Sequence, residues 1–123
     1  MILVDTSIWI DHLHRSEPSL VGALNRSAVV QHPMIAGELA LGSLRDRAGV
    51  LALLNAMPSV LVATHAEVME FVEENLLYGC GLGLVDAHLL ASVRLTRGAS
   101  LWTRDKRLAA SAERLGIDRF REN

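Results

Sequence analysis

Short apolar runs alternate with longer segments in which apolar residues recur at helical spacing. Residues 2–4 form a branched, fully apolar run, which is typical of a strand buried inside a parallel sheet. Similar runs at 29–31, 60–62 and 99–102 predict three more strands, and residues 117–120 predict a further strand at an edge. The pattern therefore predicts four to five strands.

The segments between these runs predict helices. Thr6 or Ser7 is expected to cap the first helix, and Thr64 with Glu67 forms a capping-box pattern before a later one. The expected helices cover residues 6–13, 18–28, 33–42, 47–56, 64–77, 85–96 and 106–115. Alternating strands and helices are typical of an α/β fold, in which a parallel sheet has helices on both faces.

Length and composition restrict the organisation of the chain. Its 123 residues predict one domain over 1–123, without a repeat or an interdomain linker. Half of the residues are hydrophobic, which excludes disorder and predicts apolar surface that remains exposed after folding. We therefore expect a homodimer or a tightly bound partner.

The cysteine count and the N-terminal sequence bear on location. Cys80 is the only cysteine, so neither an intrachain disulfide nor a cysteine metal cluster can form. The opening residues lack the basic start and long apolar stretch of a signal peptide, and no apolar run approaches the ~20 residues that span a bilayer. We expect a cytoplasmic protein that does not cross a membrane.

Four carboxylates stand where an α/β fold places its ligands. Such ligands gather beyond the carboxyl ends of the strands. Asp5 directly follows the first strand, and Asp105 comes three residues after the run that ends at Trp102. Glu38 lies near the start of a largely apolar helix, and Asp86 lies at the start of another. We expect the four side chains to converge.

Each of these acids also has an ordinary structural interpretation. An aspartate at a strand end or helix start commonly caps the helix, and this is the more frequent case for any single residue. Glu38 fits it less well, because the apolar residues around it predict a buried side chain, which is costly unless it is paired or binds a metal. Four clustered carboxylates would repel one another, which favours a divalent cation, and oxygen ligands favour Mg²⁺, with Mn²⁺ as a substitute.

The order of these motifs carries a family resemblance. From residue 2 to about residue 108, the chain resembles PIN-domain ribonucleases, and it is most similar to the VapC toxins of bacterial toxin–antitoxin pairs. The motifs are Asp5-Thr6-Ser7 after a strand, Glu38-Leu39 in a helix, Asp86-Ala87 after a glycine-rich loop, and Thr103-Arg104-Asp105 followed by Leu108.

The resemblance implies a PIN-like three-layer fold with a central parallel sheet flanked by helices. It implies a Mg²⁺-dependent endoribonuclease that acts as a toxin and is bound by a cognate antitoxin protein. The residues that it assigns to catalysis and to the metal are Asp5, Glu38, Asp86 and Asp105. It places Thr6, Ser7 and Thr103 behind these ligands, as residues that support them.

The basic residues are unevenly distributed. Residues 1–93 carry ten acids and four bases, whereas residues 94–123 carry four acids and eight bases. A phosphate that approaches four carboxylates needs positive charge nearby, so Arg104 and Arg107 are our candidates for RNA contact. A solvated helix face explains each of them equally well.

Other functions remain open. A PIN nuclease of ordinary RNA processing would share the four acids, and a catalytically silent PIN-like or receiver-like module would share the fold. Phosphoryl transfer of the haloacid-dehalogenase type is disfavoured, because Ser7 occupies the place of the second aspartate of that chemistry. His88 does not belong to a zinc signature, and we interpret the glycines at 79, 81 and 83 as a flexible turn.

Overall fold

The sheet lies at the centre of the molecule and has three parallel strands. The computed structural model describes residues 1–122. Strands β1 (Ile2–Val4), β2 (Val29–Val30) and β3 (Ser100–Trp102) lie in the order β2-β1-β3. β1 is central, and its Leu3 pairs with Val30 on one side and with Leu101 on the other. The predicted α/β class with a parallel sheet is confirmed.

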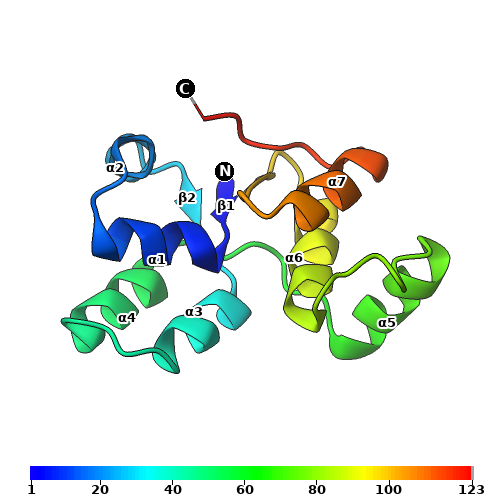
Figure 1. Ribbon diagram of the computed structural model, residues 1–123, viewed down its shortest axis with the longest axis horizontal. Helices are drawn as coiled ribbons and strands as arrows, with labels where there is room; N and C mark the ends of the chain where they lie inside the picture. Colours follow the sequence, from blue (N-terminus) through cyan, green and yellow to red (C-terminus); the bar gives the residue numbers. More distant parts are fainter. Residues whose placement is uncertain (123) are drawn as a thin grey trace.

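Helices cover both faces of this sheet. Figure 1 shows α1 to α4 on one side of the strands and α5 to α7 on the other, which gives the three layers expected from the alternation. The helices are α1 (Thr6–His14), α2 (Pro18–Asn25), α3 (Pro33–Ala40), α4 (Arg47–Ala56), α5 (His65–Glu74), α6 (Leu84–Leu95) and α7 (Lys106–Arg114). β1 is fully apolar because it is buried on both faces.

One of two predicted helix caps is confirmed and the other is wrong. The capping box before α5 is confirmed: the Glu67 N–H donates to Thr64 Oγ1 at 3.1 Å, and the Thr64 N–H donates to Glu67 Oε1 at 2.9 Å. The predicted cap of α1 is wrong, because Asp5 rather than Thr6 or Ser7 occupies that position. The Thr6 N–H donates to Asp5 Oδ1 at 2.8 Å, so this carboxylate satisfies a free amide of the first turn.

The strand predicted at residues 60–62 does not form. Ser59 makes a single bridge to Gln31, and the chain then leaves the sheet. The N–H of Leu61 donates to Thr96 Oγ1 at 2.8 Å, and the N–H of Ala63 donates to Ser92 Oγ at 3.5 Å. The side chains of Ser92 in α6 and of Thr96, directly after it, therefore accept from the backbone donors that a fourth strand would have used.

The edge strand predicted at residues 117–120 is also reduced to one bridge, between Leu101 and Arg119. Leu101 donates to the Asp118 carbonyl at 2.8 Å, and Phe120 donates to the Leu101 carbonyl at 2.9 Å. The sheet therefore has three strands rather than four to five.

The core holds both tryptophans. Trp9 is 3% exposed and Trp102 is fully buried. The ring of Trp102 lies 4.7 Å from that of Phe120, which packs the C-terminal segment against β3. Within residues 1–122, no helix is long and apolar enough to cross a membrane.

Candidate active site

Asp5 lies at the carboxyl end of the central strand and is the best anchored of the predicted acids. It is 8% exposed. Its Oδ2 accepts hydrogen bonds from Thr103 Oγ1 at 2.8 Å and from Ser7 Oγ at 3.3 Å. Burial raises the pKa of this carboxyl; the bonds from Thr103, the Thr6 N–H and Ser7 act against that rise, and the charge of Glu38 adds to it.

Glu38 joins Asp5 through Thr6. Thr6 Oγ1 donates to Glu38 Oε1 at 2.7 Å, so the first residue of α1 holds a carboxylate carried by α3. The expectation that Glu38 is buried is wrong, because its side chain is exposed. Only one face of the short helix α3 packs on the core, and its apolar neighbour Leu41 is itself 91% exposed.

Asp105 is tied to the same network from the other side of Asp5. The Asp105 N–H donates to Thr103 Oγ1 at 3.0 Å, and the Thr103 hydroxyl in turn donates to Asp5. Asp105 Oδ1 caps α7 by accepting from the N–H groups of Arg107 and Leu108 at 2.9 and 3.1 Å. This carboxylate is exposed and keeps its second oxygen free of these bonds.

Asp86 faces the group from the start of α6. Its Oδ2 accepts from the N–H of Gly83 at 2.9 Å, so it also satisfies a backbone donor at the start of its own helix. Burial raises the pKa of Asp86; the Gly83 bond acts against that rise, and the charges of Asp5 and Asp105 add to it. Asp86 is therefore close enough to both aspartates to feel their charge.

The four predicted acids thus come from four different segments and lie in one region, at the carboxyl end of the sheet. They do not close on one point: within residues 1–122, no three side chains of His, Cys, Asp or Glu lie close enough together to hold a metal ion as they stand. Each carboxylate is instead held by local donors, from Thr6, Gly83, Thr103 or the first turn of α7.

Comparison with known proteins agrees with this arrangement. Residues 2–114 match the PIN domain family. Over 117 residues, the chain is 50% identical to Ribonuclease VapC32 of Mycobacterium tuberculosis, both in strain CDC 1551 / Oshkosh and in strain ATCC 25618 / H37Rv. The match covers 95% of this chain and 94% of each relative.

The chain is a PIN-domain protein of the VapC ribonuclease family.

One predicted RNA contact of this VapC-family chain is occupied by internal bonds. Each of the five N–H groups of Arg104 donates to a carboxylate of Asp11, Glu17 or Glu122. The pair with Glu17 is bidentate, with both distances 2.9 Å. The hydrogen bonds that Arg104 donates to Glu122, and then those to Glu17, raise the pKa of Arg104, and Arg104 lowers the pKa of both acids. A phosphate could reach this guanidinium only by displacing them.

This four-residue ion cluster predicts a salt-sensitive contribution to stability. Replacement of Arg104 by Ala leaves three carboxylates facing one another, and we expect Tm to fall by roughly 5 °C at low salt. The difference should shrink in high salt, because these side chains are partly exposed to solvent. Thermal unfolding at two salt concentrations measures this, with Arg97→Ala as the control on an exposed arginine. Equal Tm values for wild type and Arg104→Ala at low salt would contradict it.

Sequence reasoning missed His32, which positions the helix of Glu38. His32 is 1% exposed and caps α3: its Nδ1 accepts from the Met34 N–H at 3.0 Å. Its Nε2 lies 3.1 Å from Ser92 Oγ and donates to that oxygen, because Nδ1 is the acceptor. Burial, followed by the charge of His88, lowers its pKa to about 4. The signal in the sequence was a histidine directly before Pro33, at the start of an apolar helix.

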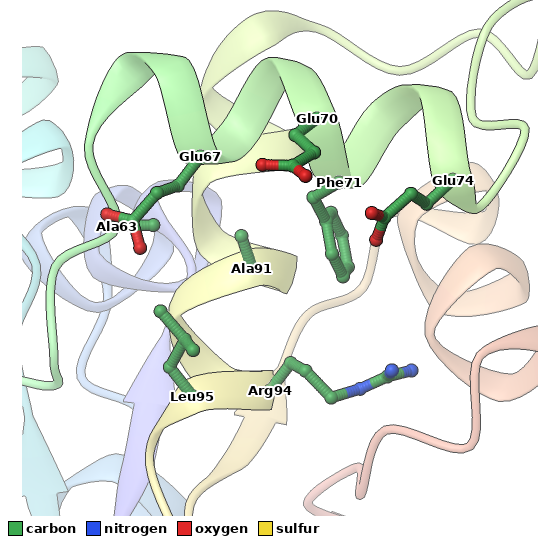
Figure 2. Close-up of a pocket in the computed structure, with 8 residues that line it drawn as sticks. All are labelled: Ala63, Glu67, Glu70, Phe71, Glu74, Ala91, Arg94 and Leu95. Carbon is green, nitrogen blue, oxygen red and sulfur yellow. The ribbon is translucent and has the colours of Figure 1, made fainter.

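A separate pocket lies between α5 and α6, and none of the four predicted acids lines it. Figure 2 shows three glutamates of α5 along its rim, with Arg94 of α6 at one end. Arg94 lies 5.8 Å from the centre of the Phe71 ring and donates to the Leu115 carbonyl at 2.6 Å, so it is held within the fold. The glutamates are Glu67, Glu70 and Glu74.

Proposed function

We propose that this chain is a metal-dependent endoribonuclease that acts as the toxin of a toxin–antitoxin pair, with Asp5, Glu38, Asp86 and Asp105 as its metal-binding and catalytic residues. Membership of the VapC ribonucleases supports the activity and the toxin role. The observation that supports the site is the continuous set of hydrogen bonds that joins Glu38, through Thr6, to Asp5 and its partner Thr103.

The donor set fits a hard divalent cation. It consists of carboxylate oxygens alone, and the pKa values of Asp5 and Asp86 are raised by burial and by neighbouring negative charge. Within residues 1–122, none of the four acids forms an ion pair with a basic side chain. Mg²⁺ would offset this charge, and Mn²⁺ is expected to substitute for it. When bound, such an ion lowers the pKa of a water and offsets charge on the departing oxygen.

The residues of the chain then have distinct tasks in hydrolysis. Attack of water on phosphorus breaks the bond to the 3′-oxygen, which leaves with a proton. Asp5 is oriented by Thr103 and Ser7, and Glu38 is oriented by Thr6, so these hydrogen bonds limit the movement of both carboxylates. Arg107 follows Asp105 by two residues and is exposed, so it is placed to meet the negative charge of the substrate.

Partners follow from the same proposal. We propose RNA as the substrate and the cytoplasm as the location, since the RNA of the cell would be the target of such a toxin. An antitoxin would lay an apolar helix in the groove that the exposed Ile10 and Leu13 of α1 form with Leu44. We also propose a homodimer of single-domain chains spanning residues 1–123, because Leu41, Leu61 and other apolar side chains are exposed.

The test compares wild type with Asp86→Asn on a pool of structured RNAs, each in Mg²⁺, Mn²⁺ or EDTA. The proposal expects cleavage by wild type with either metal, none in EDTA, and none by the variant. Asp86→Asn controls for contaminating nuclease, since a contaminant would cut equally in both preparations. Absence of metal-dependent cleavage by pure wild-type protein would overturn the proposal and favour a silent binding module.

A further inference from the structure

A second groove begins beside the carboxylates, and its exposed charges are positive. It lies between α7 and the segment that leads from α5 to α6. Figure 1 shows these two parts of the chain on the same side of the molecule. The residues that line the groove are Cys80, Lys106, Arg107, Ala110, Ser111 and Arg114.

The basic side chains of the groove form one stripe. Lys106 and Arg107, then Ala110, then Arg114 recur at spacings of three to four residues, which places them on one face of α7. From Lys106 to Arg114 the helix rises about 12 Å, which is long enough to follow more than one phosphate of a strand.

Unlike Arg104, these basic side chains are free to contact a phosphate. All three basic residues are exposed, and within residues 1–122 none of them forms an ion pair. Arg114 makes one long bond, from Nη2 to the Leu76 carbonyl at 3.5 Å. The pocket between α5 and α6 in Figure 2 differs in charge, because three glutamates line it and would repel a polyanion.

The two walls of the groove are the segments that deliver catalytic acids. One wall, α7, begins directly after Asp105, and the other leads through Gly83 to Asp86. Arg107 on one wall packs against the backbone of Gly81 on the other, since a Cβ added to Gly81 would lie only 2.7 Å from Arg107 Cδ. Gly81 also has a φ of +76°, which favours glycine. The groove therefore lies beside the segments that carry Asp86 and Asp105.

We propose that this groove binds the sugar–phosphate backbone of the RNA substrate on one side of the cleaved bond, with Lys106, Arg107 and Arg114 as its phosphate contacts. The inference rests on the proposed ribonuclease function and adds the path of the strand. Contacts of this kind set the register of the substrate but do not read its bases.

Cys80 makes the path directly observable, because it is the only cysteine of the chain and lines the groove. The probe is a mixed-sequence single-stranded RNA, added in EDTA to the Asp86→Asn variant so that no cleavage occurs. We expect the RNA to slow alkylation of Cys80 by N-ethylmaleimide at least threefold. An unchanged alkylation rate at saturating RNA would overturn the inference.

Charge variants in the same background give an independent readout. Lys106→Ala and Arg114→Ala are each expected to weaken RNA binding about three- to tenfold and to make its dependence on salt less steep by about 0.7 for each lost phosphate contact. Arg97→Ala, on an exposed arginine outside this groove, is the matched control and should bind as the parent does.

A variant that binds RNA more tightly than the parent cannot owe the change to misfolding. Ala110 is exposed in the middle of the stripe, so Ala110→Lys should tighten RNA binding and Ala110→Glu should weaken it. If wild type cleaves RNA with Mg²⁺ but Ala110→Lys and Arg114→Ala bind as the parent does, the groove proposal fails while the nuclease stands. If wild type cleaves no RNA, the proposed function itself fails.

Discussion

Asp5→Asn is expected to abolish RNA cleavage while the protein remains folded. Loss of a residue that hydrogen-bonds to a metal ligand already lowers activity about 10- to 100-fold. Loss of the most deeply buried proposed ligand should therefore lower the cleavage rate more than about 100-fold. The fold should tolerate the change, because burial and the charge of Glu38 already favour a neutral group at this position. The asparagine carbonyl can still accept from the Thr6 N–H, and its amide can donate to Thr103 Oγ1.

Two measurements on Asp5→Asn separate chemistry from stability. The rate of RNA cleavage should fall, and Tm should stay within about 3 °C of the wild-type value or rise. Asp11→Asn is a suitable control, because Asp11 is an aspartate that pairs with Arg104 and takes no part in the carboxylate site. Retained cleavage by Asp5→Asn would remove Asp5 from the catalytic set, and loss of folding would show that its charge is structural.

Acid is expected to destabilise this protein between about pH 6.5 and pH 4 through His32. In the unfolded chain this histidine takes up a proton near its ordinary pKa of 6.5, whereas burial delays protonation in the folded state to about pH 4. The unfolded state therefore binds more protons throughout this window, and stability falls as the pH falls through it. The shift corresponds to a loss of at most about 3 kcal/mol, which is complete near pH 4.

The structural reason is that His32 works only as a neutral ring. Its Nδ1 must accept from the Met34 N–H to cap α3, and a protonated ring has no acceptor. The groups that face it are Ser92 and His88, and His88 also has a lowered pKa, through burial and then through the charge of His65. None of these neighbours offers a negative charge to a protonated His32.

Urea unfolding at a series of pH values measures the effect. His32→Asn keeps a residue that caps helices well and cannot be protonated, so its stability should depend less on pH between 6.5 and 4. His14→Asn, at the exposed end of α1, should retain the wild-type dependence. Parallel curves for wild type and His32→Asn would contradict the assignment.

The sequence predicted those features that depend on neighbours along the chain. Apolar runs located β1, β2 and β3, and Pro18, Pro33 and the Thr64 capping box located helix starts. Three of the carboxylates were found for the same reason: Asp5 directly follows β1, Asp86 lies in the first turn of α6, and Asp105 directly precedes α7. Glu38 was found by its apolar neighbours, although it lies in the second half of α3.

Contacts between distant residues account for what was missed. The strand at 60–62 was lost to the hydroxyls of Ser92 and Thr96, about thirty residues away. The environment of Arg104 depends on Glu17 and Glu122, which lie 87 and 18 residues from it in sequence. Glu38 has apolar neighbours but is exposed, because the pattern of a short helix does not show how much of its surface the core covers.

The central position of β1 has a consequence for how the protein is made. β1 is synthesised first, yet one of its two neighbours, β3, is among the last elements to emerge, and Thr103 lies 98 positions after Asp5 in the sequence. At about 5–20 residues per second, roughly 5 to 20 s separate the appearance of Asp5 from that of its partner. Until β3 has emerged, the chain lacks both Thr103 and Asp105. If the proposed function holds, any product truncated before β3 is therefore expected to leave the RNA of the cell intact.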